Sequence, residues 1–310
     1  MKRERISKKR TILKRIEDNR NRYTYIEKSG VKKSGPLGVE LVTGMNKIDR
    51  NKLRIGGSPP PQVPVYIPVL KTKYPISIII TAYQTQNYIE ECLDSIEAQT
   101  YFINNDDYEV LIGVDGCKKT LKKLLEIEHK YRNLSIFIMD KNCGTYVTSN
   151  TLLTQIKYDN ILRFDSDDVM KPEMINEIMF FKDDYDVVQF LFSDFTTTIK
   201  EANGEFKYVA AGAHFYKKSV IELAGGYRNW KCAADSEFIK RIMKHTKIKR
   251  INKRLFYRRW HLGSITNKEV TNSRSVVRKN YMKKIRIYSV GEKIKIKPKT
   301  NTFIKIEKND

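Results

Sequence analysis

The stretch Ile161-Leu-Arg-Phe-Asp-Ser-Asp-Asp168 places three carboxylates within four residues, directly after a short apolar segment. Its apolar side chains Ile161, Leu162 and Phe164 are typical of a buried β-strand. Ligands of open α/β sheets bind where strands end, and carboxylates packed this closely repel one another unless a cation lies between them. The stretch therefore indicates either a metal–phosphate site at a strand end or an acidic turn before a helix that starts near Pro172.

Two more apolar segments, Ile76–Thr81 and Tyr108–Val114, predict strands that also end in polar residues. They open into Ala82-Tyr83-Gln84 and into Asp115-Gly116, and Leu134–Met139 predicts a third strand. Helical patterns separate these strands, so the series alternates between β and α. Such a series predicts an α/β fold with polar residues gathered at the strand ends. The expected helices cover residues 88–99, 118–131, 146–156 and 236–244.

In the order of its motifs, the chain resembles the nucleotide-sugar glycosyltransferases of family 2, which have the GT-A fold. The resemblance runs from about Tyr74 to about Thr266, and no single motif in it is specific. It implies a Rossmann-like mixed sheet flanked by helices, and a site for a nucleotide sugar. The motifs are Ile76–Gln99, Asp115-Gly116, Asn142-Cys-Gly144 with Asn150, Asp165–Asp168, Gly225-Gly-Tyr227, Ala234–Phe238 and Tyr257–Thr266.

Two positions depart from the family pattern. Val114 stands where the nucleotide motif of the family has its first Asp, and Ser149 stands where an Arg precedes Asn150. Contacts attributed to those family positions therefore do not transfer to this chain, and Asp115 is the carboxylate of the nucleotide motif that remains. The departures also leave open a degenerate, inactive transferase core.

The resemblance implies five nucleotide-sugar contacts, at Thr81, Tyr83, Asp115, Asp167 and Arg258. Tyr83 offers an aromatic face to the base, and Asp167 is expected to contact the ribose. An ionised Asp115 can only accept hydrogen bonds, so it suits a base with a ring N–H, such as uracil or thymine. Cytosine lacks that donor, which weighs against a CMP-sugar. We therefore expect a UDP- or dTDP-type donor.

Asp168 and His261 are the expected metal ligands, both by resemblance. A hard divalent ion such as Mn²⁺ or Mg²⁺ favours carboxylate and phosphate oxygens, and it makes the diphosphate a better leaving group. His261 has two other interpretations, as a contact of the diphosphate or as a packed residue beside Trp260. His214 is expected to be structural.

Asp235 is the expected catalytic base. An alcohol is a weak nucleophile at neutral pH, so the acceptor hydroxyl needs a group that removes its proton. Asp235 matches the base of the family, and attack by a single displacement would invert the anomeric configuration. The alternative is that Asp235 is the N-cap of the helix over 236–244, a position that Asp favours.

The charge of the 310-residue chain is +23, and it is distributed unevenly. Lys and Arg outnumber Asp and Glu by 19 to 6 in residues 1–74 and by 23 to 4 in residues 240–310, but are outnumbered by 26 to 17 in residues 75–239. The contrast indicates a polyanionic partner, namely an anionic glycan acceptor, an anionic membrane surface or DNA. The function we expect is metal-dependent, inverting glycosyl transfer to a glycan or a lipid-linked saccharide. The alternatives are transfer to modified bases in DNA and a non-catalytic polyanion-binding protein.

We expect three parts: a basic N-terminal extension (1–74), a GT-A glycosyltransferase domain (75–266) and a basic C-terminal extension (267–310). Smaller expectations are a helix over Arg5–Asn21, an extended arm or linker over Ser29–Pro68, and edge strands at Lys293–Lys297 and Phe303–Ile306.

The four cysteines, at positions 92, 117, 143 and 232, are dispersed and indicate reduced thiols rather than a zinc site or a disulfide framework. No apolar run approaches the ~20 residues of a membrane span, and the N-terminal residues lack the apolar region of a signal peptide. We therefore expect a cytoplasmic protein, either free or peripheral at a membrane surface.

Overall fold

The computed structural model describes residues 73–103, 105–196, 212–288 and 294–307, and the strands β1 to β4 before them. The chain divides into two compact units, Met1–Lys73 and Tyr74–Asp310. The first unit contains a four-stranded sheet in the order β2-β1-β3-β4. Its strands are β1 (Tyr23–Ile26), β2 (Lys32–Gly38), β3 (Glu40–Thr43) and β4 (Tyr66–Val69).

The expectation of an extended arm or linker over Ser29–Pro68 is therefore wrong where that segment is described. Strands β3 and β4 pair antiparallel, with Val42 opposite Ile67 and Thr43 opposite Tyr66. These are residue types that pack well on a pleated surface, and their pairing outweighs the Pro- and Gly-rich composition nearby. The helix expected over Arg5–Asn21 lies outside the described residues.

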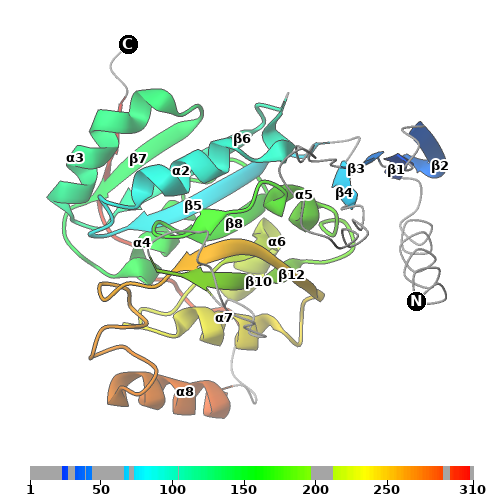
Figure 1. Ribbon diagram of the computed structural model, residues 1–310. Helices are drawn as coiled ribbons and strands as arrows, with labels where there is room; N and C mark the ends of the chain where they lie inside the picture. The colour runs from blue at the N-terminus through cyan, green and yellow to red at the C-terminus, as the bar shows by residue number, and fades with distance from the viewer. Residues whose placement is uncertain are drawn as a thin grey trace, which may run out of the picture. The chain divides into compact units, whose positions relative to one another are not determined.

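A nine-stranded mixed sheet forms the centre of the second unit, in the order β13-β7-β6-β5-β8-β11-β10-β12-β9 (Figure 1). The strands β7, β6, β5 and β8 are parallel neighbours, whereas β11 runs antiparallel to both β8 and β10. This is the mixed α/β sheet that the sequence predicts. Its strands are β5 (Ile76–Ala82), β6 (Tyr108–Val114), β7 (Leu134–Met139), β8 (Asn160–Asp165), β9 (Val169–Met170), β10 (Val187–Phe195), β11 (His214–Lys217), β12 (Ile248–Arg259) and β13 (Phe303–Ile306).

Helices cover both faces of this sheet (Figure 1). An apolar core joins α4, α6 and α7 to one face, where Ile79 of β5 and Phe238 of α7 are fully buried. Strand β5 is buried on both faces, as parallel strands between two helical layers are. The helices are α2 (Ile89–Glu97), α3 (Lys118–Ile127), α4 (Thr145–Leu152), α5 (Met174–Met179), α6 (Lys218–Ala224), α7 (Ala234–Ile242) and α8 (Val276–Tyr288), with 3₁₀ turns η2 (Thr100–Phe102) and η3 (Glu128–Lys130).

The basic C-terminal residues contribute α8 and β13 to the second unit. Strand β13 pairs antiparallel with β7 at the sheet edge, which confirms the strand expected at Phe303–Ile306. The strand expected at Lys293–Lys297 is not formed over 294–297. That segment instead contacts the C-terminal end of α6, where the backbone N–H of Ile296 donates to the Ala224 carbonyl at 3.0 Å. None of the helices in the described part of the chain has the length and apolar composition needed to cross a membrane.

Asn150 fastens α4 to the Gly-Gly-Tyr turn that precedes α7. Its side-chain amide donates to the Tyr227 carbonyl at 2.8 Å, and its Oδ1 accepts the Tyr227 backbone N–H, also at 2.8 Å. Gly226 permits this approach, because it has φ of +95° and a Cβ there would lie 2.6 Å from Asn150 Oδ1. The Tyr227 hydroxyl in turn lies 3.1 Å from Nε2 of the buried His214, so His214 belongs to the core.

We predict that Asn150→Ala destabilises the fold strongly, because it leaves the N–H and C=O of Tyr227 buried without their partner. Each unsatisfied buried group costs about 1–3 kcal/mol, so urea denaturation should show a matching fall in the free energy of unfolding. Asn280→Ala is the control, since Asn280 is exposed on α8. Equal stability of the two variants would contradict the role of Asn150 as a fastening.

Candidate functional site

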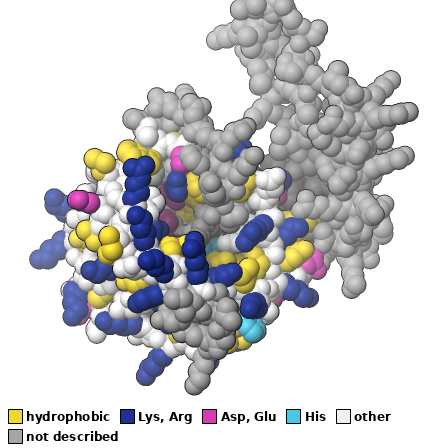
Figure 2. Space-filling view, turned by 90° about the horizontal axis from the view of Figure 1, so that it is seen from below, with side chains coloured by type: hydrophobic (Ala, Val, Ile, Leu, Met, Phe, Trp, Pro, Cys, Tyr) yellow, Lys and Arg dark blue, Asp and Glu magenta, His cyan; other side chains and the backbone are white. Residues whose placement is uncertain are grey.

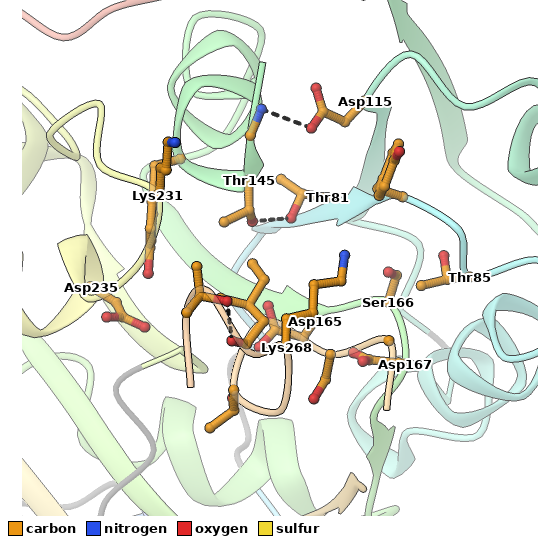
Figure 3. Close-up of a pocket in the computed structure, with 18 of the residues that line it drawn as sticks. Thr81, Thr85, Asp115, Thr145, Asp165, Ser166, Asp167, Lys231, Asp235 and Lys268 are labelled. Atoms are coloured by element: carbon orange, nitrogen blue, oxygen red, sulfur yellow. Dashed lines mark hydrogen bonds between the residues drawn. The ribbon is translucent and has the colours of Figure 1, made fainter. Parts of the chain in front are cut away.

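A cavity of about 750 Å³ opens where β5, β6 and β8 end, at their carboxyl ends (Figure 3). This volume is in the range of small-molecule sites, which is roughly 300–1,000 Å³. The structure brings together here all the site residues predicted from the sequence. They are Thr81, Tyr83, Asp115, Asp167, Asp168, Asp235, Arg258 and His261.

Asp115 is buried at the end of β6 and organises the loop before α4. Its Oδ1 accepts the backbone N–H of Cys143 at 2.7 Å, and its Oδ2 accepts that of Gly144 at 2.9 Å. A carboxylate has about four lone-pair sites, so Asp115 retains capacity to accept a further donor from the cavity. The sequence did not predict this loop-holding role.

Two more of the predicted residues, Thr81 and Tyr83, lie at the end of β5 and line the same cavity. Hydroxyls of Thr81 and Thr145 share a hydrogen bond of 2.6 Å, which connects the end of β5 to the first turn of α4. The ring of Tyr83 is 38% exposed, and the Lys268 ammonium lies 5.6 Å from its centre. Tyr83 therefore presents an accessible aromatic face at the cavity.

Two non-glycine residues with left-handed backbone lie close in the chain to residues that line the cavity. Gln84, directly after Tyr83, has φ of +59°, and Ala233, directly before α7, has φ of +64°. Such conformations cost energy in L-residues, and they occur where the surrounding structure requires them, as at ligand sites.

Asp235 lies in the first turn of α7 and lines the cavity. The cap position of α7 is occupied by Ala233, without a side-chain hydrogen bond, so the interpretation of Asp235 as the N-cap is wrong. Its Oδ1 accepts the backbone N–H of Ser236 at 2.7 Å. In Figure 3, Asp235 and Lys231 lie on the opposite side of the cavity from Asp167.

The three carboxylates of the acidic motif have three different partners. Asp165 forms an ion pair of 3.0 Å with the buried Arg163 guanidinium, from its own strand. Asp167 Oδ2 lies 2.8 Å from His261 Nε2. Asp168 is 3% exposed, and its Oδ1 accepts the backbone N–H of Arg259 at 2.9 Å.

This arrangement leaves negative charge at the end of β8 only partly compensated. Burial raises the pKa of Asp168 well above its ordinary value, and the charges of Asp167 and Asp165 raise it further. Burial also raises the pKa of Asp165, although Arg163 opposes that shift. Ionised carboxylates at this point are therefore unfavourable without additional positive charge.

The donor set fits a hard divalent cation that is shared with a ligand. Among the residues that the structure describes, no three His, Cys, Asp or Glu side chains converge as a protein-only metal site requires. Mg²⁺ is usually bound through one or two carboxylates together with substrate phosphates and water, and Mn²⁺ also favours oxygen ligands. Asp168 Oδ2, which has no hydrogen-bond partner in the described part of the chain, suits that role, whereas His261 is engaged by Asp167.

Arg258 and its neighbour Arg259 have different surroundings, because successive side chains of a strand point to opposite faces. Arg258 donates from Nε and Nη2 to the Asp194 carboxylate, at 2.7 and 2.8 Å. Arg259 instead contacts the acidic motif, through its Nε to the Asp167 carbonyl at 3.1 Å and through Nη2 to Glu91. The contact of Arg259 with the acidic motif was not predicted from the sequence. The alternation of side chains along β12 is the signal that could have distinguished Arg259 from Arg258.

The sequence model of glycosyl transferase family 2 matches residues 77–286, which is more than half of the chain. The chain belongs to glycosyl transferase family 2. The resemblance seen in the motifs is thereby confirmed, and the family match covers every residue that lines the cavity.

Relatives and solved structures agree with the family assignment. The chain is 30% identical over 113 residues to the poly(ribitol-phosphate) β-N-acetylglucosaminyltransferase TarS of Staphylococcus aureus (strain Mu50), covering 35% of this chain and 19% of TarS. It is 25% identical over 151 residues to glycosyltransferase GlyA of Streptococcus pneumoniae, covering 46% and 20%. The chain thus spans about a fifth of the length of these two relatives.

The crystal structure of S. aureus TarS 1–349 in complex with UDP-GlcNAc matches with a TM-score of 0.52 at 21% identity, covering 61% of this chain and 60% of that one. The mannosyltransferase PcManGT of Pyrobaculum calidifontis, in complex with GDP-Man and Mn²⁺, matches with a TM-score of 0.50 at 16% identity, covering 61% and 57%. At these identities the likeness shows the fold, and the GT-A fold expected from the sequence is confirmed.

We predict that Asp168→Asn stabilises the protein in the absence of divalent cations. The folded-state pKa of Asp168 is raised above its unfolded value, so the stability linked to its protonated form is lost as the pH rises above about 4. The melting temperature of the wild type should therefore fall relative to Asp168→Asn between pH 4 and 8. Adding Mn²⁺ with UDP should raise the melting temperature of the wild type only, and an equal rise in the variant would remove Asp168 from the metal site.

Asp165→Asn should stabilise the protein less than Asp168→Asn does. Burial raises the pKa of Asp165 as it raises that of Asp168, but the ion pair with Arg163 opposes this shift and is lost in the variant. Denaturant unfolding at neutral pH should therefore show the smaller gain for Asp165→Asn. An equal gain in both variants would show that Arg163 does not depend on Asp165.

Proposed function

We propose that this chain is a metal-dependent, inverting glycosyltransferase that moves a sugar from a UDP- or dTDP-type donor to an acceptor hydroxyl. The observation that carries the proposal is one cavity lined by an acidic strand end, an exposed aromatic ring and the carboxylate of Asp235. Family membership and the nucleotide sugars in the TarS and PcManGT complexes support it.

The donor binds along the ends of β5, β6 and β8 in this proposal. The base stacks on Tyr83, and its ring N–H donates to a free lone pair of Asp115. Asp167 contacts the ribose, and its orientation is held by His261. Thr81 lies between the base and the diphosphate, whereas Arg258, which is paired with Asp194, keeps its place on the cavity wall rather than binding phosphate directly.

Asp168 would hold a Mn²⁺ or Mg²⁺ ion together with the diphosphate. The chemistry that such an ion would supply is neutralisation of the charge that develops on the departing diphosphate. His261 orients the Asp167 carboxylate. Arg259 holds the acidic motif, because its Nε donates to the Asp167 carbonyl and its backbone N–H donates to the Asp168 carboxylate. These contacts keep the acidic residues in one arrangement while the donor enters.

Asp235 accepts the proton of the acceptor hydroxyl. The hydroxyl oxygen attacks the anomeric carbon, the bond from that carbon to the diphosphate oxygen breaks, and its electron pair leaves with the nucleotide. Because Asp235 lies on the opposite side of the cavity from Asp167, which contacts the donor in this proposal, attack and departure take place on opposite faces of the sugar (Figure 3). The product therefore has inverted anomeric configuration.

We also propose that the acceptor is a polyanionic glycan or a lipid-linked saccharide, reached in the cytoplasm or at a membrane surface. The basic residues after 240 support an anionic partner. Two relatives are named as enzymes that act on or make such polymers: a poly(ribitol-phosphate) β-N-acetylglucosaminyltransferase and a chondroitin synthase. Transfer to modified bases in DNA shares the same donor chemistry, so acceptor assays must include it.

Hydrolysis of a donor panel by water tests the proposal directly. UDP- and dTDP-sugars should be hydrolysed in the presence of Mn²⁺ and should bind more tightly than CMP-sugars, since cytosine offers no ring N–H to Asp115. EDTA should abolish turnover. Full activity in excess EDTA, or no binding of any nucleotide sugar, would contradict a metal-dependent transferase and favour a non-catalytic polyanion-binding protein.

We predict that Asp235→Asn leaves donor binding within a few fold while it slows transfer by about 10²–10⁴, because a general base is needed only when the acceptor loses its proton. Donor affinity by calorimetry and transfer rate by product analysis separate these effects. Ser236→Ala is the control, since Ser236 is the next residue of α7 and does not line the cavity. Equal losses in affinity and rate would assign Asp235 to donor binding instead.

A further inference from the structure

The cationic side chains that line the cavity fall into two groups. Three of them are paired with carboxylates: Arg163 with Asp165, Arg258 with Asp194, and Arg259 with Glu91. The other three, Lys231, Lys268 and Arg278, form no ion pair with any described residue. Unpaired cations in a site built for a charged substrate mark places where substrate anions bind.

Lys268 belongs to the donor side, because its ammonium lies 5.6 Å from the centre of the Tyr83 ring. Lys231 and Arg278 belong to elements on the side of Asp235. Lys231 stands in the loop before α7, four residues ahead of Asp235, and Arg278 stands in the first turn of α8. Trp230 and Tyr281 join these elements, since their rings stack at 4.5 Å with an interplanar angle of 9°.

The charges of Arg278 and Asp235 both act on the thiol of Cys232. Burial raises the pKa of this thiol, the positive charge of Arg278 lowers it, and the negative charge of Asp235 raises it. Both charged groups therefore lie within electrostatic reach of one buried side chain, which follows Lys231 directly in the chain.

The guanidinium of Arg278 is already oriented for an anion. Its Nε donates to the Thr271 carbonyl at 2.7 Å, and its two terminal nitrogens donate to none of the described residues. A fixed guanidinium fork binds two oxygens of a phosphate or carboxylate at once, and it loses little side-chain entropy in doing so. The stacked Trp230–Tyr281 pair adds an aromatic wall, against which the apolar face of a sugar or polyol can pack.

We propose that Lys231, Arg278 and the Trp230–Tyr281 pair form an acceptor subsite for a glycan or polyol chain that carries phosphate or carboxylate groups. One anionic group of the acceptor binds between Lys231 and Arg278, and this places a hydroxyl of the adjoining unit at Asp235. The inference rests on the proposed function, and it assigns the acceptor class to particular residues.

The rest of α8 supports the same partner. The helix contains five Lys and Arg residues and no Asp or Glu. Figure 2 looks onto the side of the molecule on which α8 lies, and Lys and Arg predominate among its charged side chains. Such a face attracts a polyanion over long range, whereas Lys231 and Arg278 line the cavity itself and so meet the unit that reacts.

The test compares Arg278→Gln and Lys231→Gln with Lys279→Gln. Lys279 is the next residue of α8 and is exposed, but it does not line the cavity, so it removes the same charge from the same helix. Binding is measured by calorimetry in the presence of UDP and Mn²⁺. The probes are a glycerol phosphate oligomer, a glucuronate-containing hyaluronan oligosaccharide and a neutral chitin oligosaccharide of similar length.

We expect the wild type to bind an anionic oligomer more tightly than the neutral one. Arg278→Gln and Lys231→Gln should each weaken that binding by roughly 10- to 100-fold, the loss typical of a hydrogen bond to a charged group, whereas Lys279→Gln changes it by less than about threefold. Preference for the glycerol phosphate or the hyaluronan oligomer identifies the anionic group. Arg278→Lys keeps the charge but not the fork, so binding intermediate between the wild type and Arg278→Gln is expected.

Equal binding of anionic and neutral oligomers by the wild type would overturn the inference. So would an equal loss in Lys279→Gln, because it would indicate a diffuse attraction, and so would selective binding of duplex DNA or anionic vesicles. Donor hydrolysis by water separates the two proposals, because the wild type and Lys279→Gln should both hydrolyse the donor whichever acceptor is bound. Absence of hydrolysis in the wild type would count against the transferase itself.

Discussion

Repulsion among three carboxylates at the end of β8 is the constraint on which the site depends. A single strand delivers Asp165, Asp167 and Asp168 to one point, and the protein provides each with a partner from a different place: a guanidinium on the same strand, an imidazole, and a backbone N–H. The last two come from consecutive parts of one segment, residues 259–261. The position of β12 beside β10 therefore determines how the acidic motif is held.

On the far side of the cavity, Asp235 is also positioned by contacts between packed elements. Asp235 is positioned by α7, and α7 begins after a turn whose Tyr227 is fixed by Asn150 of α4. Helix α4 in turn begins at the loop that Asp115 organises. Side-chain hydrogen bonds thus join the end of β6 to the start of α4, and α4 to the turn before α7, so packed elements contribute to the distance between the donor side and Asp235.

The parallel strands and the position of the cavity could be predicted from the sequence, because both depend on residue patterns that are local in the chain. Alternation of apolar residues identified β5, β6, β7 and β8, and polar residues at their ends identified the cavity, because parallel strands bring their carboxyl ends to one edge. What failed depended on contacts between distant residues. The contacts of Asp167 with His261, of Asn150 with Tyr227 and of Arg258 with Asp194 join positions 64 to 94 residues apart, and no periodic pattern records them. Helix α8 was missed because its many lysines and arginines obscure its weak apolar face.

The pairing of β13 with β7 has a consequence for solubility. In the sheet order β7 lies between β13 and β6, so without β13 it would present a row of unpaired backbone groups and the apolar ring of Phe137. Exposed edges of this kind recruit strands from other molecules. The Phe303–Ile306 segment covers that edge and leaves in its place a strand of four residues with an exposed Lys305, and short charged edges of this kind disfavour intermolecular β-sheet pairing.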